Sequence, residues 1–205
     1  MKTLLFLISL LFFVIQGKDE KVKSITEIRD FQKELNVQYK DSVASPLLEK
    51  DRLKFKKHQF FKIDLDYRIM AKLELTPLSD TFGMKTSTAR LPLYRKYGIA
   101  KFEVEEQVFE LSIFQNIKYS QIAEYKNGLF LLFNDDTNGK STYNGGRYID
   151  LEIPKADSIL IDFNQSYNPY CHYNDRYSCP IPPSENYLKT EIKAGIKKYK
   201  HAKKH

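Results

Sequence analysis

The chain has 205 residues, enough for one domain, and contains 14 Phe and 14 Tyr but no Trp. Its formal net charge of +7 is concentrated at the ends, because Lys2 and five lysines within residues 197–205 supply six positive charges. The remainder is close to neutral, which argues against a nucleic-acid-binding face. Residues 197–205 are predicted to be a disordered basic tail, with weak contact with an anionic envelope or lipid surface as the alternative.

The N-terminus has the pattern of a secretory signal peptide. Lys2 precedes an almost wholly apolar run over residues 3–15, and Gly17 offers a small residue at a cleavage point. The run is shorter than the ~20 residues that span a bilayer. We therefore expect residues 1–17 to be a signal peptide cleaved near Gly17, with export to a periplasmic or extracellular space. A retained membrane anchor is the alternative.

Residues 18–42 are predicted to form a helix, within an N-terminal helical segment that ends at residue 45. Ser24 and Glu27 resemble a capping box at its start. Apolar residues then recur near helical spacing with charged residues between them: Ile25, Ile28, Phe31, Leu35 and Tyr39. This pattern predicts an amphipathic helix packed on the outside of the domain.

The chain from residue 46 to residue 196 has the pattern of β-strands. A hairpin is expected from residues 98–104 and 107–115 around Glu105 and Glu106, and the apolar run over residues 129–133 is typical of a strand buried on both faces. Further strands are expected over residues 67–75, 147–153, 158–163 and 188–194. Seven or eight strands without intervening helices predict a mainly β domain, whose antiparallel sheet is barrel-like or forms a sandwich.

Polar residues gather between the later strands, where loops carry many binding and catalytic side chains. Asp135 and Asp136 come just before Asn138 and Gly139, a pair that favours a tight hairpin turn. One interpretation is that these residues cap the turn through backbone hydrogen bonds. The other makes Asp135 or Asp136 a ligand acceptor, general base or metal ligand, although the spacing is not that of a calcium-binding loop.

Arg147 follows two glycines at the start of a predicted strand. Gly145 and Gly146 would let the backbone approach a ligand closely, while the guanidinium grips a carboxylate or phosphate. The alternative is a bulge or turn followed by a structural ion pair, with Asp150 or Asp162 as the partner. Arg95 is a second candidate for the same anion site.

Cys171 and Cys179 flank a short loop and lack the close-pair spacing of a structural zinc site. In an exported protein they predict a disulfide that would rigidify the surrounding Tyr- and Pro-rich loop. Metal binding and a nucleophilic Cys171 are the alternatives. His172 is a poor catalytic partner for Cys171, because adjacent residues on a strand point to opposite faces.

Several long motifs occur together in the chain after residue 45: FGMKTST (82–88), YRKYG (94–98), LFLLFNDDTNG (129–139), TYNGGRYID (142–150), DFNQSYNPYC (162–171) and SCPIPPSEN (178–186). With these motifs the sequence resembles the DUF1684 family, and residues 46–196 are identified as a DUF1684-like β domain. The family has no established activity to transfer. The resemblance points to the same polar block and assigns no roles within it.

Three functions remain open. The first is binding of a small polar or anionic ligand in a β-domain pocket, with Arg95 and Arg147 holding an anion. Hydrogen bonds and stacking would then come from six other residues: Tyr143, Tyr148, Asp150, Asp162, Asn164 and Asn168.

The second is a hydrolase that uses Asp135, Asp136 or Asp162 for acid–base chemistry near Arg147. The third is a structural or interaction protein of the cell envelope, with tyrosines of the 168–183 loop as its contact surface. No cofactor or metal is assigned, because the sequence lacks a phosphate loop, a nucleophile elbow and a dinucleotide fingerprint.

Overall fold

A computed structural model describes the backbone of residues 2–199 and the side chains of residues 19–199. The helices are α1 (Lys2–Lys40) and α2 (Glu49–Arg52). The strands are β1 (Arg68–Leu75), β2 (Thr81–Gly83), β3 (Leu93–Val104), β4 (Gln107–Asn116), β5 (Gly128–Asp135), β6 (Arg147–Glu152), β7 (Ser158–Asp162) and β8 (Tyr187–Leu188). Most of the predicted basic tail lies outside the described residues.

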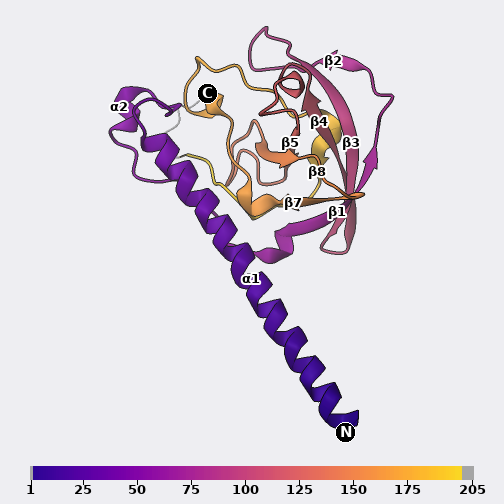
Figure 1. Ribbon diagram of the computed structural model, residues 1–205. Helices are drawn as coiled ribbons and strands as arrows, with labels where there is room; N and C mark the ends of the chain where they lie inside the picture. The colour runs from indigo at the N-terminus through magenta and orange to yellow at the C-terminus, as the bar shows by residue number, and fades with distance from the viewer. Residues whose placement is uncertain (1, 200–205) are drawn as a thin grey trace.

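The strands form one curled sheet, an antiparallel half-barrel (Figure 1), so the prediction of a mainly β, barrel-like fold is confirmed in this open form. The strand order is β6-β5-β4-β3-β1-β7, and every neighbouring pair along this path is antiparallel. β2 adds to β3, and β8 pairs with β5 in parallel. The path ends on β6 at one edge and on β7 at the other.

The predicted hairpin is confirmed. β3 and β4 pair in register up to Val104 and Gln107, with Glu105 and Glu106 as the two-residue turn. Both glutamates have positive φ, 50° and 64°, as a primed two-residue turn requires. The register shifts once between Lys96 and Gly98, where a Cβ on Gly98 would come within 2.8 Å of the Glu74 carbonyl oxygen on β1.

The last predicted strand is shorter than expected. β8 ends at Leu188, and the alternating residues 189–194 form no further strand in the structure. Ile192 and Ala194 are fully buried, but their carbonyl oxygens accept hydrogen bonds from Arg147. The alternating pattern therefore predicted correctly that Ile192 and Ala194 are buried. Their carbonyl oxygens, however, bind the Arg147 side chain and not a neighbouring strand.

The main core fills the concave face of the sheet. It contains alternate residues of each long strand together with segments that follow β7 and β8: Ala71, Leu73, Ala100, Phe102, Leu111, Ile113, Leu129, Leu131, Phe133, Ile149, Ile159, Ile161, Phe163, Leu188, Ile192 and Ala194. A second set lies on the opposite face of β4, β5 and β6, including Phe114, Leu132 and Tyr148. These two layers confirm the prediction that the strand over residues 129–133 is buried on both faces.

The C-terminal part of helix α1 lies beside the β domain, and the helix continues without a break at Ser24, so the predicted capping box does not start it (Figure 1). Glu27 instead pairs with Arg68 of β1, with 2.6 Å between the carboxylate and the guanidinium. Ile28, Leu35 and Tyr39 are the buried contacts. The predicted cleavage point near Gly17 lies within α1, and cleavage and export stay predictions. No described helix combines the length and apolar character needed to cross a membrane.

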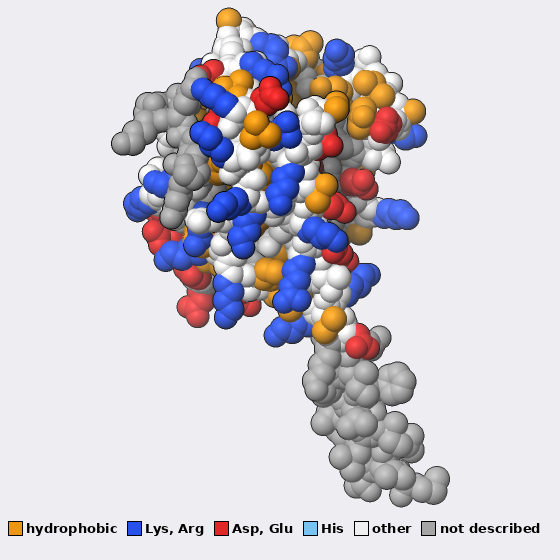
Figure 2. All heavy atoms as spheres, turned by 90° about the vertical axis from the view of Figure 1, so that its left-hand side faces the viewer, with side chains coloured by type: hydrophobic (Ala, Val, Ile, Leu, Met, Phe, Trp, Pro, Cys, Tyr) orange, Lys and Arg blue, Asp and Glu red, His pale blue; other side chains and the backbone are white. Residues whose placement is uncertain are grey.

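Surface charges of both signs are interleaved. Lys101 on β3 lies 3.1 Å from Glu74 of β1 and 3.1 Å from Glu110 of β4. On the face shown in Figure 2, Lys and Arg side chains are likewise scattered among acidic and hydrophobic ones. Exposed pairs of this kind contribute about 0–1 kcal/mol each, so they mark a solvated surface.

An aromatic cluster joins α1 to the C-terminal segment, and a buried histidine lies inside it. The ring of His58 packs against Tyr39 and Phe55 with centroid distances of 4.3 and 4.8 Å. Its Nε2 atom has no hydrogen-bond partner among the described residues. Burial, and to a lesser extent the nearby His172, lower the pKa of His58 to about 3.

This histidine should make the fold acid-sensitive. The unfolded chain takes up a proton on His58 below about pH 6.5, whereas the folded chain resists it down to about pH 3, so stability is lost as the pH falls through that window. Between pH 7 and pH 5 we expect a loss of about 2 kcal/mol from this group. Urea unfolding at both pH values measures it, and His58→Phe should remove that part of the loss. An equal loss in the variant would contradict the assignment.

Candidate functional site

Arg147 lies in the interior and is fully buried. Its Nη2 atom donates to Asp135 Oδ2 at 2.7 Å and to the Ile192 carbonyl at 2.9 Å. Its Nη1 atom donates to the Ala194 carbonyl and to Ser166 Oγ. The guanidinium also sits 5.0 Å from the centre of the Phe133 ring. The sequence offered Asp150 or Asp162 as partners for a structural ion pair, whereas the partner is Asp135.

The Asp135–Gly139 segment builds the turn after β5. Asp135 accepts from the backbone N–H of Thr137 at 2.8 Å while its other oxygen holds Arg147. Asp136 is partly exposed and accepts from the Tyr187 hydroxyl. Asn138 donates to the Tyr143 carbonyl. The turn-capping interpretation therefore describes these contacts, and the Asp135 carboxylate has no open side toward solvent.

Asp162 and Asn164 belong to a separate network at the end of β7. Arg68 Nη1 donates to Asp162 at 2.6 Å, and the same guanidinium reaches Glu27 on α1. Asn164 donates to the Asp64 carbonyl at 2.8 Å and to Asp162 at 2.9 Å. These contacts fasten α1 and the chain before β1 to the sheet.

Asn168 is buried in a third network, toward α1. Its Nδ2 atom donates to the Tyr173 hydroxyl at 3.2 Å and to the Lys197 carbonyl at 3.1 Å. Tyr173 is buried as well, while Tyr170 and Tyr177 are half-buried. Arg147, Asp162 and Asn168 thus occupy separate buried networks.

The remaining arginine and two tyrosines differ in exposure. Arg95 is half-buried and donates twice to Gln115 Oε1, at 3.0 and 2.6 Å. Tyr148 is buried, donates to the Pro180 carbonyl and packs edge-on against Phe130 at 4.8 Å. Tyr143 is half-buried, with its ring 4.1 Å from that of His172.

A groove of about 1390 Å³ lies on the sheet face opposite the main core, and we call it the strand groove. Its floor is built from Tyr94 of β3, Asn116 of β4, Phe130 of β5 and Asp150 of β6. The register brings these residues side by side, because Tyr94 pairs with Asn116 and Phe130 pairs with Asp150. Phe114 of β4 pairs with Phe130 of β5 and so links β4 to β5 under the groove.

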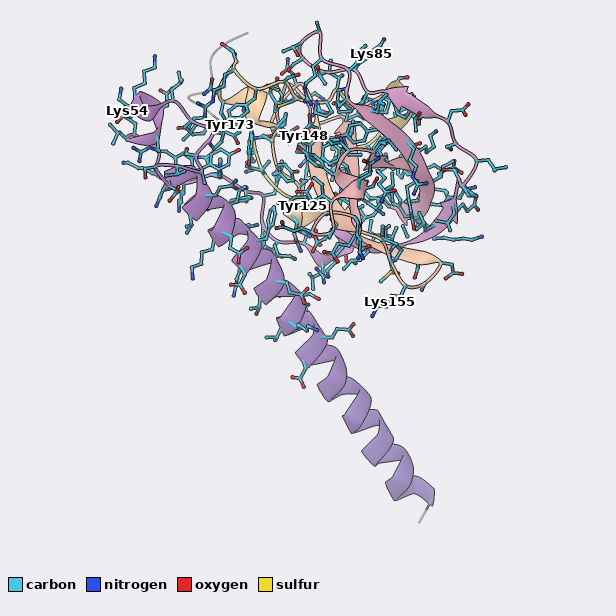
Figure 3. The ribbon with its side chains drawn as sticks, turned by 45° about the horizontal axis from the view of Figure 1, so that its top comes forward. Lys54, Lys85, Tyr125, Tyr148, Lys155 and Tyr173 are labelled. Atoms are coloured by element: carbon cyan, nitrogen blue, oxygen red, sulfur yellow. The ribbon has the colours of Figure 1, made fainter. Side chains whose placement is uncertain are left out.

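The sides of the strand groove come from three loops. Residues 117–128 supply Tyr119 and Tyr125, whose rings meet edge-on at 5.9 Å, and residues 90–93 and the 170–180 segment supply the rest. Figure 3 labels Tyr125 in the first of these loops and Tyr148 in the sheet, with Tyr173 on the side toward α1. The groove is therefore rich in aromatic side chains.

Asp150 is the one predicted site residue that lines the strand groove. Its carboxylate accepts from the Tyr167 hydroxyl at 2.8 Å. Asp150 is exposed, yet protein atoms around its carboxylate desolvate it and raise its pKa, and the Tyr167 hydrogen bond opposes that rise. A carboxylate with one oxygen fixed by a phenol keeps acceptor capacity for a ligand.

The predicted disulfide is wrong: Cys171 and Cys179 are both free thiols. The backbone N–H of Cys171 donates to the Cys179 sulfur at 3.1 Å, so the two residues are neighbours without being bonded. Cys171 lies on a short 3-10 turn (Tyr170–His172) and not on a strand, so the strand geometry expected for Cys171 and His172 does not apply. His172 turns its Nε2 atom to the backbone N–H of Tyr199 at 3.1 Å.

The comparisons with known proteins agree with this architecture. A family model described as "Protein of unknown function (DUF1684)" matches residues 53–197. The chain belongs to the DUF1684 family. The resemblance found in the sequence motifs is thereby confirmed, and the matched region contains all eight strands and both cysteines.

One solved structure similar to this DUF1684 chain is the solution NMR structure of an uncharacterized protein from Haloarcula marismortui. The two sequences are 29% identical, the TM-score is 0.68, and the alignment covers 87% of this chain and 96% of the other. No curated protein matches the sequence. Family membership therefore supplies the fold and leaves the activity to be argued from the site.

The residues of the DUF1684 chain that line the strand groove were largely missed from sequence, except Asp150. The signal that would have found them is the alternation of β5 and β6, which puts Phe130 and Asp150 on the face opposite Leu131 and Ile149. Within residues 19–199, no group of three or more His, Cys, Asp or Glu side chains is placed to hold a metal ion.

Proposed function

We propose that this protein binds a small polar, uncharged ligand with the chemistry of a sugar ring in the strand groove. The observation that carries the proposal is the pairing of Phe130 with Asp150 on the groove floor. This pairing sets an aromatic surface directly beside a carboxylate acceptor. Grooves with an apolar lining and a few placed polar groups are the usual sites for small ligands.

The aromatic side chains suit a ligand with one apolar face. Tyr94 and Phe130 lie next to each other on the floor, with ring centroids 6.3 Å apart and an interplanar angle of 33°. Tyr119 and Tyr125 add two exposed rings at the side. A sugar ring presents C–H groups on its faces and hydroxyls at its edge, so rings contact the former while polar groups bind the latter.

The polar groups favour hydroxyls over anions. Asp150 and Glu152 line the groove from β6, and Glu124 lines it from the 117–128 loop. The cationic lining residues are Lys118 and Arg90, and Arg90 donates to the Ser178 carbonyl at 2.6 Å. Because the carboxylates outnumber the cations, an anionic ligand would meet net repulsion.

The size of the groove is also informative. At about 1390 Å³ it exceeds the ~300–1,000 Å³ typical of pockets for single small molecules. It therefore has room for a ligand of more than one ring. The buried networks around Arg147, Asp162 and Asn168 give acid–base chemistry no such open space, and so they do not favour the hydrolase alternative.

The test is a binding screen by thermal shift and calorimetry, with mono- and disaccharides in one arm and carboxylates and phosphates in the other. For any sugar that binds, Asp150→Ala and Tyr125→Ala should each weaken the affinity at least about fivefold, a loss of about 1 kcal/mol. Asp157→Ala is the matched control, because Asp157 is an exposed aspartate in the β6–β7 loop and does not line the groove.

The outcomes separate the ligand classes. Binding of sugars that is weakened by the groove variants and unaffected by the control supports the proposal. The raised pKa of Asp150 means that its carboxylate is protonated earlier as the pH falls. Sugar binding through this carboxylate should therefore begin to weaken, on acidification, at a higher pH than it would with an ordinary aspartate. Binding of anions alone, or binding that all three variants leave unchanged, would overturn it.

A further inference from the structure

The end of the molecule around α2 is built from two segments that are far apart in the sequence, residues 40–60 and residues 196–199, and we call it the basic end. α2 lies just beyond the C-terminal end of α1 (Figure 1). The backbone N–H of Lys197 donates to the Gln59 carbonyl at 2.8 Å, which joins the two segments. They therefore lie side by side at one end of the protein.

Positive charge is concentrated at the basic end. It contains eight Lys or Arg side chains and three Asp or Glu, whereas residues 19–199 as a whole contain 28 and 26. The rest of the described chain therefore has a small excess of acidic side chains. Figure 2 faces this end and shows Lys and Arg side chains spread across it, with fewer acidic ones.

The lysines that follow α2 are held outward by two buried neighbours. Phe55 and His58 are buried, while the positions beside them, Lys54, Lys56 and Lys57, are exposed. None of these three lysines forms an ion pair with a carboxylate of the described chain, whereas several lysines of the sheet do. Their charges are therefore available to an external anion.

Two apolar side chains project into solvent from the same segment. Val43 follows α1 and is 92% exposed, and Leu53 directly follows α2 and is 73% exposed. The guanidinium of Arg52 donates to the Lys40 carbonyl at 3.3 Å, which holds α2 against the end of α1. A lipid bilayer suits this combination, because its surface presents anionic headgroups and the layer beneath takes up apolar groups. A soluble polyanion would use the cations alone.

We propose that the basic end binds the surface of a lipid bilayer that contains anionic lipids. Lys54, Lys56 and Lys57 contact the headgroups, while Val43 and Leu53 enter the layer beneath them. Each lysine near such a surface strengthens binding about fivefold, and salt screens the attraction. No residue of the basic end lines the strand groove, so the proposal does not depend on sugar binding.

The test is sedimentation of the full-length chain with vesicles of phosphatidylcholine alone, or of phosphatidylcholine and phosphatidylglycerol in equal parts. Residues 3–15 are apolar and would bind to either vesicle, so the measured quantity is the ratio of the two partition coefficients. At low salt we expect the anionic vesicles to bind the chain at least about tenfold more tightly, and at high NaCl this preference should disappear.

Replacing three lysines of the basic end together with glutamine should reduce the preference for anionic vesicles at least about tenfold: Lys54→Gln, Lys56→Gln and Lys57→Gln. The matched control replaces three exposed lysines outside the basic end and removes the same net charge: Lys85→Gln, Lys155→Gln and Lys189→Gln. Figure 3 labels Lys54, Lys85 and Lys155 in three separate parts of the molecule. The control should keep most of the preference.

A second variant separates a bilayer from a soluble polyanion. Val43→Ser combined with Leu53→Ser should weaken binding to the anionic vesicles at least about fivefold and leave binding to heparin unchanged. All the substituted side chains are exposed, so circular dichroism should show an unchanged fold. Equal binding to the two vesicles, an equal loss in the control triple variant, or vesicle binding unchanged by the Val43 and Leu53 substitutions would each overturn the proposal.

Discussion

Replacing Asp135 with alanine is expected to lower the free energy of unfolding by about 3–5 kcal/mol. The substitution leaves the fully buried guanidinium of Arg147 without the carboxylate that lies 2.7 Å from it. Burial already lowers the pKa of Arg147, and Asp135 opposes that shift, so the charge loses its main compensation. Urea unfolding followed by circular dichroism measures the change.

Asp136→Ala is the matched control, since it removes a carboxylate from the neighbouring position. Asp136 is partly exposed and accepts only from the exposed Tyr187 hydroxyl among its side-chain contacts in the described structure, so the expected loss is no more than about 1 kcal/mol. Similar losses for the two variants would show that the Arg147–Asp135 pair does not organise the interior.

Replacing Gly146 with alanine is expected to have the second-largest effect, about 2–5 kcal/mol. Gly146 has φ of +89°, and a Cβ there would come within 2.6 Å of Pro182 Cγ and 2.7 Å of the Phe133 carbonyl oxygen. Neither neighbour can yield easily, because one is a proline ring and the other is backbone. Thermal or urea unfolding measures the loss.

Gly139 provides the comparison that separates backbone strain from crowding. Its φ is +76°, yet an added Cβ would meet nothing closer than the Asn144 Cβ at 3.8 Å. Gly139→Ala should therefore cost about 1–2 kcal/mol, the backbone part alone. If Gly139→Ala and Gly146→Ala were equally destabilising, the close packing of Gly146 against the 180–183 segment would not contribute to the free energy of unfolding.

Much of the fold could be predicted because alternation and turn chemistry are local. The Glu105-Glu106 hairpin and the two-sided burial of residues 129–133 followed from short stretches of sequence. The predicted strand over residues 188–194 was mostly absent, because the carbonyls of Ile192 and Ala194 accept hydrogen bonds from Arg147, a distant side chain. The predicted capping box at the start of α1 was also wrong. Ser24 and Glu27 fit the pattern of a cap, but the helix runs through both residues and Glu27 forms an ion pair with Arg68.

The site was harder to predict for a specific reason. Alternation puts Arg147 on the same face as Ile149, and Tyr148 on the same face as Asp150. The sequence does not say which of these faces is the core, and a fully buried arginine is rare, so both an open anion site and a structural ion pair were predicted for Arg147 as alternatives. Arg147 is buried on the core face of β6, and Asp150 is the predicted site residue of β6 that lines the strand groove.

The most direct test of ligand binding in the strand groove is an NMR titration of isotope-labelled protein with a sugar that binds in the screen. We expect the largest amide shifts on Tyr94, Asn116, Phe130 and Asp150, with the amides around Arg147 and Asn168 almost unchanged. Shifts centred on Arg147 and Asn168, with the groove floor silent, would contradict it.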